Sequence, residues 1–175
     1  MTTLVVENGT GLSNANSYVD VAEADTYFAT HPFYADNWDA LGSPDQENVL
    51  IAASSMLDSI MSWYGYIYSS TQGLGWPRTG VIDYENRVVA SNAVPYAVKR
   101  ATMELAVYIS RGDPFAAASS TGVDRLKIDV IEIQFSDTQN GASRVTAPVP
   151  AAALLALRGL GEYVLGSRVR RVMVG

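Results

Sequence analysis

The sequence predicts a mainly α-helical fold: a small bundle of about four helices with a β-hairpin or strand extension and extended terminal arms. Three observations support this prediction. Apolar residues recur at three- and four-residue steps in separate segments. A proline or a helix-capping residue stands at the start of these segments. Strand-like alternation of apolar and polar residues is confined to shorter stretches, most clearly after residue 123.

The first expected helix begins near residue 21 and ends near residue 31. Asp20 and Glu23 form a capping box at its start, and Pro32 disfavours helical backbone at His31. Its inner side is expected to contain Ala22, Ala24, Tyr27 and Phe28. Residues 32–42 are rich in aromatic side chains and are expected to form a loop.

A second helix is expected to begin at Ser43, a capping residue that is followed by Pro44 in the first turn. Its apolar face predicts an amphipathic helix of about five turns; the residues of this face are Val49, Leu50, Ala53, Met56, Leu57, Ile60 and Met61. An aromatic run follows over residues 63–68. We expect its side chains to pack where this helix ends or at a subunit interface. Residues 81–84 and 87–90 are expected to form a short hairpin.

A third helix is expected to open at Pro95 and to stop before Gly112. Its inner face is expected to contain Val98, Ala101, Thr102, Leu105, Tyr108 and Ile109. Alternation predicts a strand over residues 124–136, with a β-bulge after Val130, and a weaker strand over residues 143–147. A fourth helix is expected over about residues 150–164, and its apolar residues are Leu154, Leu155, Leu157, Leu160 and Val164.

These elements are expected to form a single domain over residues 1–165, whose β-extension covers about residues 81–90 and 124–147. Residues 166–175 alternate valine with arginine and are expected to form an extended C-terminal arm. A chain of 175 residues can bury roughly 70% of its unfolded surface, so it needs neither a disulfide nor a metal to fold.

Composition excludes several kinds of site. The chain has no cysteine and a single histidine, His31, so thiolate sites, cysteine nucleophiles and multi-histidine metal cages are excluded. The acidic residues between Asp20 and Asp45 fit no calcium-loop spacing, and helix starts explain most of them. No serine stands in a nucleophile motif. We therefore expect no enzyme, with no catalytic residue, cofactor or metal, and a hydrolase on these carboxylates is kept only as a formal alternative.

Targeting and membrane signals are not expected either. The first residues lack the basic and apolar regions of a signal peptide. The longest uncharged apolar stretch, residues 145–157, is too short to span a bilayer as a helix. These patterns predict a protein that is made in a cytoplasmic compartment and has no membrane partner.

Charge is divided unevenly along the chain. Residues 1–86 carry eleven acids and one base, Arg78, whereas residues 87–175 carry seven acids and eleven bases. Such a division suits head-to-tail contact between copies, and the alternative is two independently solvated surfaces. Strong nucleic-acid binding is disfavoured, because phosphate contact needs a basic footprint. The one dense basic group is Arg168, Arg170 and Arg171.

Aromatic residues raise one nucleic-acid hypothesis. Alternating aromatics can stack the bases of a single strand when basic neighbours follow its backbone. No lysine or arginine occurs before Trp76, which favours a packing role for the aromatic run. Trp76 and Pro77 are interpreted as a loop anchor, with a buried indole and a fixed φ. Arg78 is expected to pair with a carboxylate of this subunit or the next.

Several motifs together resemble a known family. They are the segment 14–19, Ala22 to Asp25, Tyr27-Phe28, Leu57-Asp58, Gly65, Gln72, Leu74, the block 76–80 (WPRTG), Val94-Pro95, Val98, Ala101 and Glu104 to Ala106. The chain is similar over about residues 12–165 to tailed-phage head–tail connector (adaptor) proteins, the group filed as DnaT-like single-stranded-DNA-binding proteins. It differs at Tyr66 and Ile67, where a basic residue is expected, and at Asn86, which replaces a turn glycine and tolerates left-handed backbone.

The resemblance implies a structural virion protein. Connector subunits form a dodecameric ring beneath the portal, extend the DNA channel and join the head to the next neck or tail-completion protein. Double-stranded DNA would pass through the lumen without sequence-specific binding during packaging and ejection. The protein would be made in the bacterial host cytoplasm and reside in the neck of the virion.

The C-terminal arm is expected to dock on the portal, because its valine–arginine alternation suits strand addition or a groove. The residues concerned are Arg168, Val169, Arg170, Arg171, Val172, Met173 and Val174. The alternative function is a single-stranded-DNA-binding module of a phage. It would use Trp63, Tyr64, Tyr66, Tyr68 and the C-terminal arginines.

Overall fold

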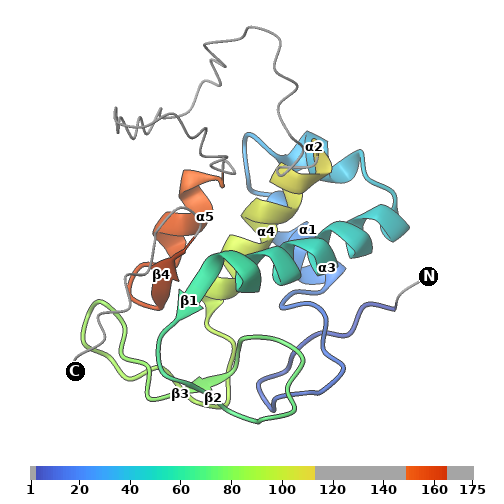
Figure 1. The fold of residues 1–175 in the computed structure, drawn as a ribbon. Helices are drawn as coiled ribbons and strands as arrows, with labels where there is room; N and C mark the ends of the chain where they lie inside the picture. The colour runs from blue at the N-terminus through green and yellow to red at the C-terminus, as the bar shows by residue number, and fades with distance from the viewer. Residues whose placement is uncertain (1–2, 113–148, 165–175) are drawn as a thin grey trace, which may run out of the picture.

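The computed structural model describes residues 3–112 and 149–164 (Figure 1). Within these ranges five helices account for most of the regular structure, and the expectation of a mainly α-helical fold with small β-elements is confirmed. The helices are α1 (Val21–Phe28), α2 (Ala35–Asp39), α3 (Ser43–Ile60), α4 (Tyr96–Ser110) and α5 (Ala151–Ala156). The strands predicted over residues 124–136 and 143–147 and the arm over 166–175 lie outside the described residues.

Helix α4 forms the centre of the bundle. It packs against α3 along one side and against α5 on another, while α1 packs on α3 (Figure 1). All seven residues from Ala101 to Val107 are buried, so this helix has no solvent-facing stripe over two turns. The core around it includes Phe28, Trp38, Leu50, Leu57, Ile60, Met103, Leu105 and Leu157, each at most 1% exposed.

Two short antiparallel strand pairs lie at one end of the bundle. β1 (Met61–Trp63) continues directly from α3 and pairs with β4 (Gly161–Tyr163), with Met61 opposite Tyr163. β2 (Tyr66–Ile67) pairs with β3 (Arg78–Thr79). The β1–β4 pair therefore connects the end of α3 to the segment that follows α5.

The start of α1 and the hairpin follow the sequence patterns. The Asp20 carboxylate accepts a hydrogen bond of 2.7 Å from the backbone N–H of Glu23, as an N-cap does. Residues 81–90 form a tight turn with an antiparallel bridge between Ile82 and Val88. Asn86 has a φ of 66°, the left-handed conformation that asparagine tolerates better than most residues.

Four expectations about the helices are wrong. The segment 32–42 is not all loop, because α2 forms within it and buries Trp38 against Phe28. The cap of α3 is Gly42, and Ser43 is already helical. Ala22 is exposed, since it lies on the outer side of α1. The fourth helix ends at Ala156 rather than near residue 164.

Glycine explains the early end of α5. Gly159 has a φ of +82°, and a Cβ there would lie 2.5 Å from the backbone nitrogen of Tyr84. The chain turns at this position and enters β4, where a Cβ on Gly161 would lie 2.7 Å from the carbonyl oxygen of Ser62. Both close approaches require a residue without a side chain.

Candidate functional site

The aromatic loop over residues 63–80 is the most distinctive part of the described chain, and buried polar side chains hold it in place. We define the Asp58 cluster as Tyr18, Asp58, Trp63, Gly75 and Trp76. These residues come from the segment before α1, the last turn of α3, β1 and the loop before β3. The cluster therefore connects segments up to 58 residues apart in the sequence.

Asp58 is the central acceptor of this cluster. Its Oδ1 accepts hydrogen bonds from the Tyr18 hydroxyl at 2.6 Å and from Trp63 Nε1 at 2.9 Å. Its Oδ2 accepts one from the Gly75 backbone N–H at 2.8 Å. Burial raises the pKa of Asp58 above its usual value, although these three donors act in the opposite direction.

Tyr18 extends the network to the next residue of the loop. Its side chain is fully buried, and its hydroxyl accepts a hydrogen bond of 3.2 Å from the Trp76 backbone N–H. Burial, followed by the neighbouring Asp58 charge, raises the pKa of Tyr18 well above 10. The phenol therefore stays protonated at neutral pH and can donate to Asp58 while it accepts from Trp76.

Arg78 holds the loop from its other end. Its Nε donates to the Tyr64 carbonyl at 2.7 Å, and its two terminal nitrogens donate to Gly65 at 2.8 Å and Gly75 at 3.1 Å. Arg78 was expected to pair with a carboxylate of this subunit or the next. Within this chain its guanidinium binds backbone carbonyls instead. Burial lowers the pKa of Arg78 relative to an exposed arginine, but the group remains charged at neutral pH.

Trp76 and Pro77 are both buried, and a cis peptide bond joins them. The Trp76 ring lies edge-on to Trp63, with 5.8 Å between ring centroids. Its Nε1 is buried and has no hydrogen-bond partner among the described residues. The indole of Trp76 therefore contributes to the core by packing alone.

Two glycines permit the close approach of loop and cluster. Gly65 has a φ of +69°, and a Cβ there would lie 2.3 Å from the Thr79 carbonyl oxygen. A Cβ on Gly75 would lie 2.6 Å from Asp58 Oδ1. The sequence did not predict the hydrogen bond between Tyr18 and Asp58, because forty residues separate them.

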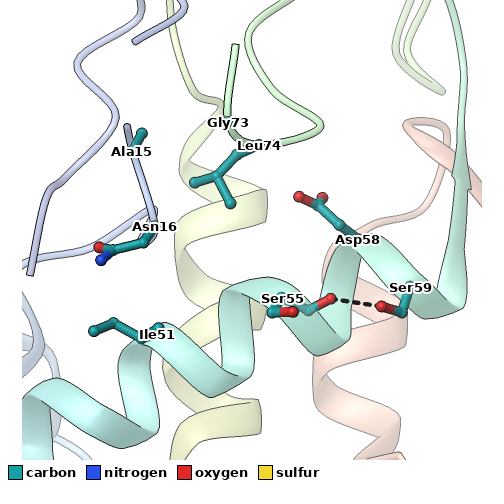
Figure 2. A pocket seen from close by; sticks show the side chains of 8 residues that line it. All are labelled: Ala15, Asn16, Ile51, Ser55, Asp58, Ser59, Gly73 and Leu74. Atoms are coloured by element: carbon teal, nitrogen blue, oxygen red, sulfur yellow. Dashed lines mark hydrogen bonds between the residues drawn. The ribbon is translucent and has the colours of Figure 1, made fainter. Parts of the chain in front are cut away.

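A groove of about 450 Å³ lies beside the Asp58 cluster, between the exposed side of α3 and the two loops that cover it (Figure 2). Its lining is mixed, with a carboxylate, hydroxyls and an amide next to aliphatic side chains. The lining residues are Ala15, Asn16, Ile51, Ser55, Asp58, Ser59, Gly73 and Leu74. This composition suits a ligand with both an aliphatic and a polar or cationic part.

The aromatic segment, which we define as Tyr64, Tyr66, Ile67 and Tyr68, faces outward. These side chains are 43%, 78%, 50% and 48% exposed, respectively. The expectation that the aromatic run packs where α3 ends is therefore wrong for these side chains. It holds for Trp63, whose indole points inward and donates to Asp58. Ile82, Tyr84 and Val88 in the following hairpin are also more than half exposed.

Cations that could accompany these aromatics are already engaged. The described ranges contain thirteen acidic and six basic side chains. Each of the six contacts another group within the chain. Two are paired with carboxylates: Arg87 with Asp83 and Glu85, and Lys99 with Glu23. Four contact neutral groups: Arg78 backbone carbonyls, Arg100 the Tyr27 hydroxyl, Arg111 the Asn37 amide and Arg158 the Tyr84 ring. The described surface is therefore acidic and lacks a free basic track.

A second buried polar group lies at α4. Glu104 is 2% exposed, accepts a hydrogen bond of 2.5 Å from the Tyr27 hydroxyl and lies 3.4 Å from His31 Nε2. His31 stacks on Tyr34 at 4.6 Å. The single histidine of the chain therefore packs against a carboxylate and an aromatic ring. No serine or other nucleophile bonds to this group among the described residues.

Glu7 is a buried residue that sequence patterns did not single out. Its carboxylate accepts hydrogen bonds from the backbone N–H groups of Gly9, Gly11 and Leu12 at 2.8 to 3.0 Å. It thereby closes the glycine-rich loop near the N-terminus. This side chain occupies the N–H groups that an anion would otherwise need.

The described residues contain neither a metal-binding cluster nor a membrane-spanning helix. No three histidine, aspartate or glutamate side chains converge as a metal site within residues 3–112 and 149–164. Over these residues no helix is long and apolar enough to cross a bilayer. The arm residues Arg168 to Val174, singled out from the sequence, lie outside the described ranges.

One comparison with known proteins gives a match. A family model described as "Putative DnaT-like ssDNA binding protein" matches residues 2–172, nearly the whole chain. No curated protein and no solved structure matches the chain significantly.

Proposed function

The chain belongs to the DnaT-like ssDNA-binding family. From its resemblance to head–tail connector proteins and from its described surface, we propose that it is a structural assembly protein of a tailed phage, a head–tail connector subunit. Copies of it form a ring beneath the portal, and the ring carries the DNA channel toward the neck or tail. The described surface exposes aromatic and apolar side chains that are suited to contact with another protein.

The observation that carries the proposal is the exposed aromatic segment on an acidic surface. Tyr66 is 78% exposed, and the neighbouring hairpin adds Ile82 at 54% and Val88 at 80%. Exposed apolar and aromatic side chains of this kind are typical of protein interfaces. Phosphate contact would instead need a basic footprint, and the described ranges contain thirteen acidic and six basic side chains.

Ring formation would use two different surfaces on each copy. The acidic first half and the basic second half of the sequence provide complementary charge for such a contact. The C-terminal arm, Arg168 to Val174, would dock on the portal, where its arginines pair with carboxylates. The face of the ring away from the portal would contact the next neck or tail-completion protein.

The experiment is co-sedimentation of the purified protein with its cognate portal ring, followed by class averages in the electron microscope. We expect an added ring at one end of the portal. Deletion of residues 167–175 should abolish the added ring, whereas Tyr96→Ser, which changes an exposed tyrosine on α4, should not. A complex that forms equally well without the arm would refute the docking role of the arm. No complex in low or high salt would refute the connector role.

Single-stranded DNA binding is the second candidate, and the description of the family favours it. Tyr64, Tyr66 and Tyr68 alternate and are exposed, so they could stack bases at about 1–3 kcal/mol each. The necessary cations would come from Arg168, Arg170 and Arg171, outside the described residues. The candidate therefore depends on these arginines as much as on the tyrosines.

Fluorescence anisotropy with a labelled oligonucleotide tests this candidate. Binding should weaken steeply as salt rises, and Tyr66→Ala should weaken it while Tyr96→Ala should not. Absence of binding at low salt would exclude the DNA-binding function. If binding were unchanged both in Tyr66→Ala and after loss of Arg168, Arg170 and Arg171, these residues would not form the DNA-binding surface.

A further inference from the structure

The groove beside Asp58 has an unfilled acceptor. Asp58 Oδ1 accepts two hydrogen bonds, but Oδ2 accepts only the one from the Gly75 N–H among the described residues. A carboxylate oxygen has room for a second donor. Figure 2 shows this carboxylate at one end of the groove, between α3 and the turn at Gly73 and Leu74.

All three donors to Asp58 are neutral groups. Arg78 is close enough to influence the carboxylate electrostatically, but its guanidinium donates to backbone carbonyls instead. A buried carboxylate without a bonded cation is costly, and a guanidinium would compensate that cost. The groove therefore favours a cationic ligand group.

The rest of the lining suits the stem of an arginine. Ile51 and Leu74 provide aliphatic contact, while Ser55, Ser59 and Asn16 provide polar atoms along the same face. The Ser59 hydroxyl donates to the Ser55 carbonyl, so both residues stay close to the helix and leave the groove open (Figure 2). An aliphatic stem that ends in a charged group matches this arrangement.

The described chain ends beside the last turn of α3, which carries part of the groove. The Val164 N–H donates to the Ile60 carbonyl at 2.9 Å, next to Ser59 in α3. Because β4 is antiparallel to β1, β4 runs back toward the end of α3. Four further residues reach Arg168 and can span about 13 Å, while α3 rises about 14 Å from Ile51 to Ile60.

We propose that the groove binds the C-terminal segment of the same chain, residues 166–175, with the guanidinium of Arg168, Arg170 or Arg171 at Asp58 Oδ2. This segment contains the densest basic group of the sequence. The inference concerns the free protein and does not rest on the connector function. If the arm also docks on a portal, groove and portal compete for the same arginines.

Disulfide trapping in the full-length chain tests this proposal, because the natural sequence has no cysteine. The test variant combines Ser59→Cys with Val169→Cys, and a disulfide requires Cα atoms about 4.4–6.8 Å apart. The control combines Asn48→Cys with Val169→Cys. Asn48 is exposed on the same helix, about three turns from Ser59. The yield of monomeric disulfide is measured on a non-reducing gel under mild oxidation.

We expect the Ser59 pair to form about tenfold more monomeric disulfide than the Asn48 pair, the effect typical of a charge-assisted contact. Asp58→Asn should remove this excess, with circular dichroism to check the fold. Replacing Arg168, Arg170 and Arg171 by glutamine should also remove it. Equal yields in both pairs, or an excess that survives the arginine changes, would overturn the proposal. Disulfide-linked dimers in place of monomers would overturn the same-chain assignment and point to a second copy.

Discussion

Replacement of Arg78 by lysine tests whether the guanidinium holds the aromatic loop. Lysine keeps the positive charge but replaces a planar fork of donors by a single nitrogen. The arginine donates to the carbonyls of Tyr64, Gly65 and Gly75 at 2.7 to 3.1 Å. A lysine nitrogen can retain about one of these contacts in good geometry.

The cost follows from the contacts that are lost. Hydrogen bonds to a charged group contribute about 1.5–3 kcal/mol each, and two would be lost. The Tyr64 contact is solvent-exposed, so water can replace part of it. We therefore expect Arg78→Lys to lower the free energy of unfolding by about 2–3 kcal/mol.

Urea denaturation followed by tryptophan fluorescence measures this change, because Trp63 and Trp76 lie next to the loop. With a slope of about 2 kcal/mol per molar urea, the midpoint should fall by roughly 1 M. Arg87→Lys is the matched control: that side chain also makes two ion pairs, with Asp83 and Glu85, but it is 68% exposed. We expect no measurable shift for the control. If both variants shifted the midpoint equally, the role assigned to the Arg78 fork would be wrong.

Three further predictions concern the glycines and the buried acids. Gly65→Ala should cost more than about 2 kcal/mol, since its Cβ would lie 2.3 Å from the Thr79 carbonyl oxygen. Gly80 has a similar φ of +72°, but its Cβ would meet only a Tyr66 ring atom at 4.0 Å, so Gly80→Ala should cost about 1 kcal/mol by thermal melting. In a background that lacks residues 166–175, Asp58→Asn should gain stability relative to its parent as pH rises above 3.8, because burial raises the native pKa of Asp58 and the parent alone must ionise a buried acid; a difference between the two in urea melts that does not change from about pH 4 to 7 would contradict this. Burial and the neighbouring Glu104 raise the pKa of Tyr27 to about 12. The stability advantage of wild type over Tyr27→Phe should therefore be complete below pH 10 and smaller at about pH 11. An advantage that grows with pH would contradict this prediction.

Local sequence signals predicted the helices well where one side chain controls one boundary. Asp20 caps α1 through its carboxylate, as its spacing to Glu23 indicates. Pro95 precedes α4, and Gly112 follows it. Such boundaries depend on contacts within one turn, which the sequence displays directly.

Elements that depend on distant contacts were not predictable in this way. Helix α2 lies in an aromatic stretch with no periodic pattern, and it is stabilised where Trp38 donates to Asp25 and stacks on Phe28. Gly159 ends the fourth helix early because its φ is positive and the hairpin at Tyr84 packs against it. A glycine in a sequence shows that a turn is possible but not that a neighbour requires it.

The candidate site likewise contains one feature that the sequence predicts and others that it does not. Burial of Trp76 follows from its side-chain chemistry, whereas the partners of Arg78 could not be read from the sequence, because they are backbone carbonyls. The link between Tyr18 and Asp58 requires two helices to be in place before it can form. No spacing rule connects residues forty positions apart.

The residues that hold the aromatic loop differ from the residues that could bind a partner. Tyr18, Asp58, Trp76 and Arg78 bind or pack within the chain. Both candidate functions instead need the C-terminal arginines, and loss of those arginines cannot separate them. The oligonucleotide titration can separate them, because a loss of oligonucleotide binding in Tyr66→Ala is expected only where the Tyr66 ring stacks on a base.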